Sequence, residues 1–231
     1  MTKSASDQNT LRVAVVERHP LLRAGIRSAL DTTEGIDIVA ETGDAGRVVP
    51  LVRSTAPDVV LMDLDLPDSA SLEVCRSLVR EGGVTGVLGM TRHGDDEELL
   101  RSALVAGVRG YVSKAAGTHE MVSAVHLVGD GFMVASDGAA RLVAGLLRSP
   151  GPATGPGRGP GQDPLPLLTR REREILDLVA RGYDNRRIAR ALTLADKTVR
   201  NHVSAVFGKI GVNCRAQAVV YARDAGMGLA G

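Results

Sequence analysis

Hydrophobic and polar positions alternate between two patterns along the first 130 residues. Short runs rich in β-branched residues are each followed by a stretch with apolar residues at helical spacing, such as Leu21, Leu22, Ile26 and Leu30. Five such pairs in about 120 residues predict a parallel sheet covered by helices on both faces. The predicted strands are residues 12–16, 37–40, 59–62, 86–90 and 110–112.

Polar residues follow four of these strands. In a parallel sheet, reactive groups gather beyond the carboxyl ends of the strands. Glu17 and Arg18 come after the first strand, Asp63 after the third, Thr91 after the fourth and Lys114 after the fifth. We therefore expect a carboxylate, a hydroxyl and an ammonium group to meet in one pocket.

Residues 167–231 have helical spacing throughout. Thr169 and Glu172 match a capping box, and Gly182 ends the helix that this box begins. Asp184 is expected to cap a second, short helix. Two further helices are predicted over residues 196–208 and 215–225.

The third of these helices has two distinct faces. Its apolar residues follow core spacing: Val199, Val203, Val206, Phe207 and Ile210. The opposite face carries Lys197, Arg200, Asn201 and Ser204. Such side chains reach phosphates and base edges in a major groove. The short preceding helix and tight turn favour a helix-turn-helix over a merely solvated face.

The charge is divided unevenly along the 231 residues. The formal net charge is +1, yet residues 1–149 hold 15 Lys and Arg against 20 Asp and Glu, whereas residues 167–231 hold 12 against 6. This asymmetry indicates a nucleic-acid-binding domain joined to an acidic partner domain. With 44% hydrophobic but only 2% aromatic residues, the cores are expected to be aliphatic.

Prolines and glycines interleave between positions 150 and 166, a composition typical of a linker. The expected organisation is a disordered N-terminus at 1–10, a first domain at 11–130, a helical extension and linker at 131–166, and a second domain at 167–231. No apolar run reaches the length of a membrane span or forms a secretory leader, so a cytoplasmic protein with no membrane partner is expected.

Several segments of the second domain resemble the four-helix LuxR-type helix-turn-helix. They are LTRREREILDLVARG at 168–182, KTVRNHVS at 197–204 and KIGVN at 209–213. The resemblance implies major-groove contacts from Arg200, Asn201 and Ser204. It also implies contacts to the phosphates of double-stranded DNA from Lys197, Thr198 and Lys209, and a dimer contact through the last helix.

One helix start departs from the LuxR-type pattern. Ala195 stands where the family commonly has a capping serine. We expect Asp196 to take over that cap.

The first domain resembles the receiver domain of two-component response regulators, and with the helical tail the chain resembles the NarL/FixJ family. The matching segments are RVAVVERHPLLRAG at 12–25, PDVVLMDLDLP at 57–67, Met90-Thr91 and AGVRGYVSK at 106–114. The implied fold is a doubly wound, flavodoxin-like α/β receiver with a five-stranded parallel sheet, followed by the small all-α domain.

The receiver resemblance also implies roles for pocket residues. Asp63 would accept a phosphoryl group from a histidine kinase, Lys114 and Thr91 would bind the phosphoryl oxygens, and Tyr111 would change rotamer with Thr91. Such a transfer requires neutralisation of the charge on the phosphoryl group.

The sequence departs from the family after the first strand, where two adjacent acids normally hold Mg²⁺. Here the pair is Glu17 and Arg18, and a guanidinium cannot ligate a cation. Only Glu17 and Asp63 remain as side-chain ligands if Mg²⁺ binds, so weak or absent binding and no resident cofactor are predicted.

Two interpretations of the pocket follow. In the first, Asp63 is phosphorylated at a reduced rate. In the second, Arg18 pairs with Asp63 as a fixed positive charge, and the receiver is atypical and acts independently of phosphorylation. We favour the second, because a permanent cation offsets the charge that metal and phosphate would bring.

Two further alternatives remain at this point. Asp63-Leu-Asp65 resembles the Asp-x-Asp of haloacid-dehalogenase-type phosphatases, although the third strand is the wrong position for that motif. A receiver that senses a small molecule is the other alternative. The favoured function is a transcription regulator rather than an enzyme, acting as a homodimer or as a heterodimer with a related regulator.

Overall fold

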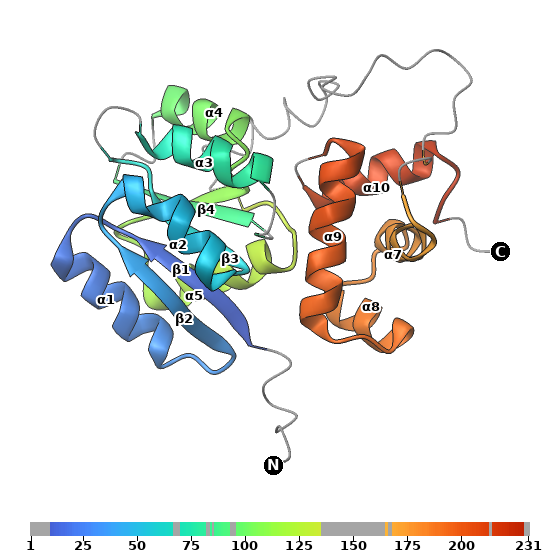
Figure 1. The fold of residues 1–231 in the computed structure, drawn as a ribbon, viewed down its shortest axis with the longest axis horizontal. Helices are drawn as coiled ribbons and strands as arrows, with labels where there is room; N and C mark the ends of the chain where they lie inside the picture. The colour runs from blue at the N-terminus through green and yellow to red at the C-terminus, as the bar shows by residue number, and fades with distance from the viewer. Residues whose placement is uncertain are drawn as a thin grey trace.

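The computed structural model describes residues 10–66, 70–81, 84, 86–92, 96–134, 165, 168–212 and 214–228. They form an α/β domain and an all-α domain that lie side by side (Figure 1). The predicted disorder at residues 1–9 and most of the predicted extension and linker fall outside the described residues. No helix in the described ranges is both long and apolar enough to cross a membrane.

The first domain is built on the predicted sheet. Its five parallel strands have the order β2-β1-β3-β4-β5, which is the flavodoxin-like order. All five predicted strands are confirmed with slightly wider bounds: β1 (Leu11–Val16), β2 (Ile36–Thr42), β3 (Val59–Asp63), β4 (Gly86–Thr91) and β5 (Gly110–Ser113).

Helices cover both faces of this sheet. One core layer joins β1 and β3 to α1 and α5 through residues such as Leu30, Leu61 and Val125, and the other packs Met62 and Leu78 under α2, α3 and α4. The elements are α1 (Pro20–Asp31), η2 (Ala45–Arg47), α2 (Val48–Thr55), α3 (Ala70–Glu81), α4 (Glu97–Val105) and α5 (Thr118–Gly129). The layered arrangement confirms the predicted fold class.

The chain after α5 differs from the expected helical extension where it is described. Gly131 has φ of +83°, which turns the chain out of the helix, and Val134 forms a parallel bridge with Gly110. Residues 131–134 are therefore not helical, and Val134 makes an isolated bridge to the first residue of β5.

The second domain contains four helices: α7 (Arg170–Ala180), α8 (Asn185–Leu192), α9 (Asp196–Ile210) and α10 (Arg215–Asp224). They enclose a core that includes Ile175, Leu176, Ile188 and Phe207. The described domain confirms the four predicted helices.

Two predicted caps are confirmed. Glu172 N–H donates to Thr169 Oγ1 at 3.3 Å and Thr169 N–H donates to Glu172 Oε2 at 2.7 Å, which completes the capping box of α7. Asp184 Oδ1 accepts the N–H of Arg187 at 2.7 Å at the start of α8.

The cap expected from Asp196 is wrong. Ala195 occupies the N-cap position of α9 without a side-chain bond, and Asp196 is already the first helical residue. A carboxylate there faces the positive end of the helix dipole but cannot act from the N-cap position.

Candidate functional site

The carboxyl ends of the strands bring four of the five expected pocket groups together. Asp63 ends β3 and Thr91 ends β4, while Glu17 and Lys114 each follow directly after a strand. Glu17, Asp63 and Thr91 are fully buried, with 0% of their surface exposed. The sheet thus places two acids, a hydroxyl and an ammonium group in one protected site.

Lys114 is the centre of this pocket. Its Nζ lies 2.5 Å from Asp63 Oδ1, 3.0 Å from Glu17 Oε2 and 3.3 Å from Asp65 Oδ2. Burial acts to lower the pKa of Lys114, but the bonds and charges of Asp63 and Glu17 outweigh burial and raise it. One permanent cation therefore holds three carboxylates.

Asp65 is a pocket residue that the sequence did not assign to this site. Its carboxylate accepts the Thr91 hydroxyl at 2.9 Å and the Arg92 N–H at 3.1 Å. Burial acts to raise the pKa of Asp65, and the bonds from Thr91, Arg92 and Lys114 outweigh it and lower the pKa. The sequence feature that could have identified Asp65 as a pocket residue is its position two residues after Asp63, in the turn that follows β3.

The expected Arg18–Asp63 ion pair is wrong. Arg18 is half-buried, has no hydrogen bond or ion pair within the described part of the chain, and its Nε is buried without a partner. Lys114 already occupies the position beside Asp63. The fixed positive charge of the pocket comes from Lys114, which follows β5, and not from Arg18.

Tyr111 lies in β5 and is 3% exposed. Its ring packs with Leu100 of α4 in a small cluster separate from the main core layers. The side chain is therefore in an inward position, on the strand that leads to Lys114.

The donor set does not fit a conventional Mg²⁺ site. No group of three or more His, Cys, Asp or Glu residues is arranged to hold a metal within the ranges that the structure describes. Glu17 Oε1 is taken by the His19 N–H at 2.8 Å, Asp65 is turned to Thr91, and Arg18 replaces an acidic ligand.

The second candidate site is α9, and its expected DNA-contacting residues fall into two groups. Asn201 and Lys209 are exposed, and Lys197, Thr198 and Ser204 are half-buried. Lys209 Nζ bonds both oxygens of Glu172, at 2.7 and 2.8 Å. Arg200 is different, because only 4% of its surface is exposed.

Arg200 is buried because α9 packs against the receiver (Figure 1). Its Nη2 lies 3.3 Å from Asp58 Oδ2 and 3.3 Å from the Thr10 carbonyl oxygen. Ser204 Oγ donates to the Val84 carbonyl at 2.9 Å. Two of the three residues expected in the major groove thus contact the receiver.

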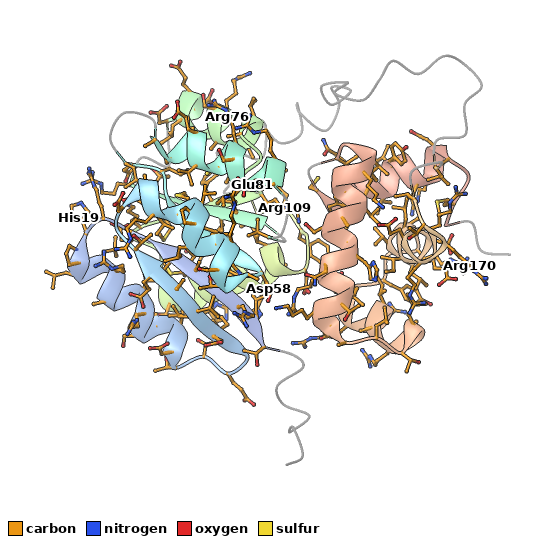
Figure 2. All side chains as sticks on the ribbon, in the orientation of Figure 1. His19, Asp58, Arg76, Glu81, Arg109 and Arg170 are labelled. Carbon is orange, nitrogen blue, oxygen red and sulfur yellow. The ribbon has the colours of Figure 1, made fainter. Side chains whose placement is uncertain are left out.

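The contact lies at the end of the sheet opposite the pocket. Asp58 precedes β3 and Arg109 precedes β5, and Figure 2 shows both beside the helical domain, with His19 at the far end. Arg109 stacks over Phe207 of α9 with 5.3 Å to the ring centre. Burial lowers the pKa of Arg109 to about 10, and its Nη1 is buried without a hydrogen-bond partner among the described residues.

Arg215 of α10 extends the same contact. Its backbone N–H donates to the Gly131 carbonyl at 3.2 Å, and Nη1 donates to the Asp130 carbonyl at 3.3 Å and to Asn185 Oδ1 at 3.1 Å. A polar cleft of about 430 Å³ opens between the domains beside Arg200, and His126 and Arg186 also line it.

Comparisons with known proteins agree with both halves of the structure. The family described as response regulator receiver domain matches residues 13–126, and the family described as bacterial regulatory proteins, luxR family, matches residues 166–222. The DNA-binding transcriptional activator DevR/DosR of Mycobacterium tuberculosis is 35% identical over 214 residues, which cover 93% of this chain and 94% of that protein. The chain belongs to the NarL/FixJ-type response regulators.

Other members of the family give the same picture. The nitrate/nitrite response regulator NarL of Escherichia coli is 30% identical to this response regulator over 216 residues, covering 94% of this chain and 96% of that protein. A solved two-component response regulator of the LuxR family from an Aurantimonas species is 34% identical, covers 59% of this chain and 96% of its own, and has a TM-score of 0.53. The relatives are transcription regulators, which leaves the phosphatase interpretation of Asp63-Leu-Asp65 without support.

Proposed function

We propose that this response regulator controls transcription by releasing α9 from a closed arrangement in which the receiver covers part of its DNA-reading face. The burial of Arg200 carries the proposal. A guanidinium held between Asp58 and the Thr10 carbonyl is not available to a base pair. Specific DNA binding therefore requires the two domains to separate.

The DNA contacts are assigned to α9 and its ends. Arg200, Asn201 and Ser204 read the major groove, and Lys197, Thr198 and Lys209 hold phosphates. The excess of basic residues in 167–231 supports attraction to duplex DNA. In the closed form Asn201 is the major-groove residue with an exposed side chain.

The open form is proposed to bind paired half-sites as a dimer, with α10 in the contact. Val220 of α10 is 60% exposed, and an exposed apolar side chain supports a second subunit there. The partner is a copy of this chain or a related regulator. The functional domains are residues 11–130 and 167–231, and the protein acts in the cytoplasm without a membrane partner.

We further propose that phosphorylation of Asp63 is slow and not required for opening. Two features support slow phosphorylation. Arg18 stands where the family normally has an acidic residue, and Lys114 is already bound by three carboxylates of the chain. One observation favours conventional phosphorylation by a histidine kinase as the second candidate, because Asp63 Oδ2 is buried beside Lys114 and has no hydrogen-bond partner in the part of the chain that the structure describes.

A charge-neutral substitution tests the closed arrangement. Asp58→Asn removes the charge that holds Arg200 but keeps an oxygen to accept the Arg12 N–H. Bonds to charged groups contribute about 1.5–3 kcal/mol, so we expect about tenfold tighter binding in gel shifts with a duplex selected from a random library. Asp37→Asn, an exposed change on β2, is the control. Equal affinity of Asp58→Asn and wild type would contradict the proposal.

Phosphorylation is tested on the full chain with acetyl phosphate and Mg²⁺. We expect Asp63→Asn to leave DNA affinity unchanged, whether or not the phosphodonor is present. Strong labelling of the wild type that raises DNA affinity, with both effects lost in Asp63→Asn, would establish the second candidate. Arg18→Asp restores the missing acid and is expected to increase labelling.

A further inference from the structure

The Asp65 side chain turns back from the loop after β3 toward the ends of β4 and β5. Its two oxygens receive the Thr91 hydroxyl at 2.9 Å, the Arg92 N–H at 3.1 Å and the Lys114 ammonium at 3.3 Å. Arg92 Nε adds a fourth contact at 3.3 Å. An anion-binding set of a hydroxyl, an amide and two cationic groups is therefore occupied by a carboxylate of the chain itself.

These donors are the ones that a group bound to Asp63 would need. Asp63 Oδ1 accepts hydrogen bonds from the Asp65 N–H at 2.8 Å and from Lys114 Nζ at 2.5 Å, whereas Oδ2 is buried and receives no hydrogen bond from any described residue. An oxyanion carried on Oδ2 would require nearby donors to stabilise its charge. Thr91 and Lys114 are present, but Asp65 already uses both.

Asp65 repels any second anion that approaches the donors of Thr91, Arg92 and Lys114. Asp65 is 5% exposed at its side chain, so water screens its charge weakly. Its lowered pKa keeps the carboxylate ionised at neutral pH. An incoming phosphoryl group therefore meets a like charge at the position of its own oxygens.

We propose that Asp65 is a positioning residue that acts as an internal anion, occupying the oxyanion-binding donors beside Asp63 and excluding a phosphoryl group until it turns away. The inference rests on the proposed slow phosphorylation and goes beyond it by naming the side chain responsible. It also explains how Thr91 is anchored in the unmodified chain.

The first test is labelling of the full chain by acetyl phosphate with Mg²⁺. In this reaction an Asp63 oxygen bonds to phosphorus while the bond from phosphorus to acetate breaks, and acetate leaves with the electron pair. We expect Asp65→Ala to label about tenfold faster than wild type, because a like charge beside the reacting oxygens is removed. Asp65→Asn, which preserves shape, is expected to give the same direction, and Asp31→Asn at the exposed end of α1 is the matched control.

A second test does not depend on transfer or on metal. Inorganic phosphate is titrated while the thermal midpoint and the NMR signal of Thr91 are followed. We expect phosphate to stabilise Asp65→Ala and shift Thr91, and to do neither in wild type. Labelling and phosphate response equal to wild type in both Asp65 variants would overturn the inference. Failure of the proposed slow phosphorylation would instead appear as rapid labelling of the wild type, and failure of the closed arrangement would appear in the DNA affinity of Asp58→Asn.

Discussion

The two ends of the receiver sheet carry opposite imbalances of buried charge. At the carboxyl ends, Glu17, Asp63 and Asp65 share the ammonium of Lys114. At the amino ends, the guanidiniums of Arg109, Arg200 and Arg215 are buried where the two domains meet. The five residues of β3 separate the two sites by about 17 Å at the usual rise per residue.

This difference in charge balance indicates which of the two sites is held together more strongly. The pocket is held by strong attraction, since each acid there has the same close cation. At the amino ends, Arg200 forms an ion pair with Asp58 at 3.3 Å, while Arg109 stacks on an aromatic ring and forms no ion pair with an acid among the residues that the structure describes. A buried guanidinium without an acid favours a state in which water or a phosphate can reach it. The closed contact is therefore the weaker of the two.

The largest expected effect comes from breaking the pocket. Lys114→Met leaves three buried carboxylates without their common cation, so we expect a loss of about 3–5 kcal/mol in the free energy of unfolding. Urea unfolding at pH 7 measures it. Because the pKa of Lys114 is raised, its stabilisation is full below its ordinary value of 10.5, and the gap to wild type should narrow only above it. A loss below about 1 kcal/mol at pH 7 would mean that Lys114 contributes no more than a solvent-exposed ion pair.

Replacing a buried cation by methionine at the opposite end of the sheet should change the free energy of unfolding much less, and in the opposite direction. Arg109→Met removes a buried cation and leaves no acid unpaired, so we expect stability to be unchanged or raised by about 1 kcal/mol. A firmer closed contact should weaken DNA binding by about fivefold in gel shifts. Arg76→Met on the exposed surface of α3 is the control (Figure 2). A strong loss of stability in Arg109→Met would show that the two ends are equally dependent on their cations.

The smallest effect is expected from an ion pair away from both ends. Glu172→Gln keeps the shape of the capping box but removes the charge beside Lys209, so we expect a loss of about 0.5–1 kcal/mol at pH 7. Burial acts to raise the pKa of Glu172, and Lys209 and Thr169 outweigh it and lower the pKa from 4.5. The wild type should therefore lose this advantage as the pH falls below about 4.5, which thermal unfolding across pH 3–7 measures. A difference that persists at pH 3 would assign the effect to packing instead of charge.

Local patterns were enough to predict the five strands of the sheet and the four described helices of the second domain. The strand runs, the Thr169–Glu172 box and the Asp184 cap depend on neighbours in sequence, and the structure confirms each. The contact between Asp63 and Lys114 could also be predicted from the sequence, because parallel strands align their carboxyl ends.

Direction and distance could not be predicted in the same way. The position of Arg18 directly after β1 could be predicted from the sequence. No local pattern indicated that Lys114, and not Arg18, would pair with Asp63. Asp65 lies in a turn, where no strand alternation determines which way a side chain points. The bond from Arg200 to Asp58 joins residues 142 positions apart, and no periodicity records such a contact.

The burial of Arg200 by the receiver also limits how this regulator can evolve. The proposed operator contact and the closed state use one guanidinium, so a substitution that alters base preference at this position simultaneously alters the basal level of transcription. A change of target sequence would need a compensating change at Asp58 to preserve the off state. Positions 58 and 200 are therefore expected to vary together as such regulators diverge to new promoters.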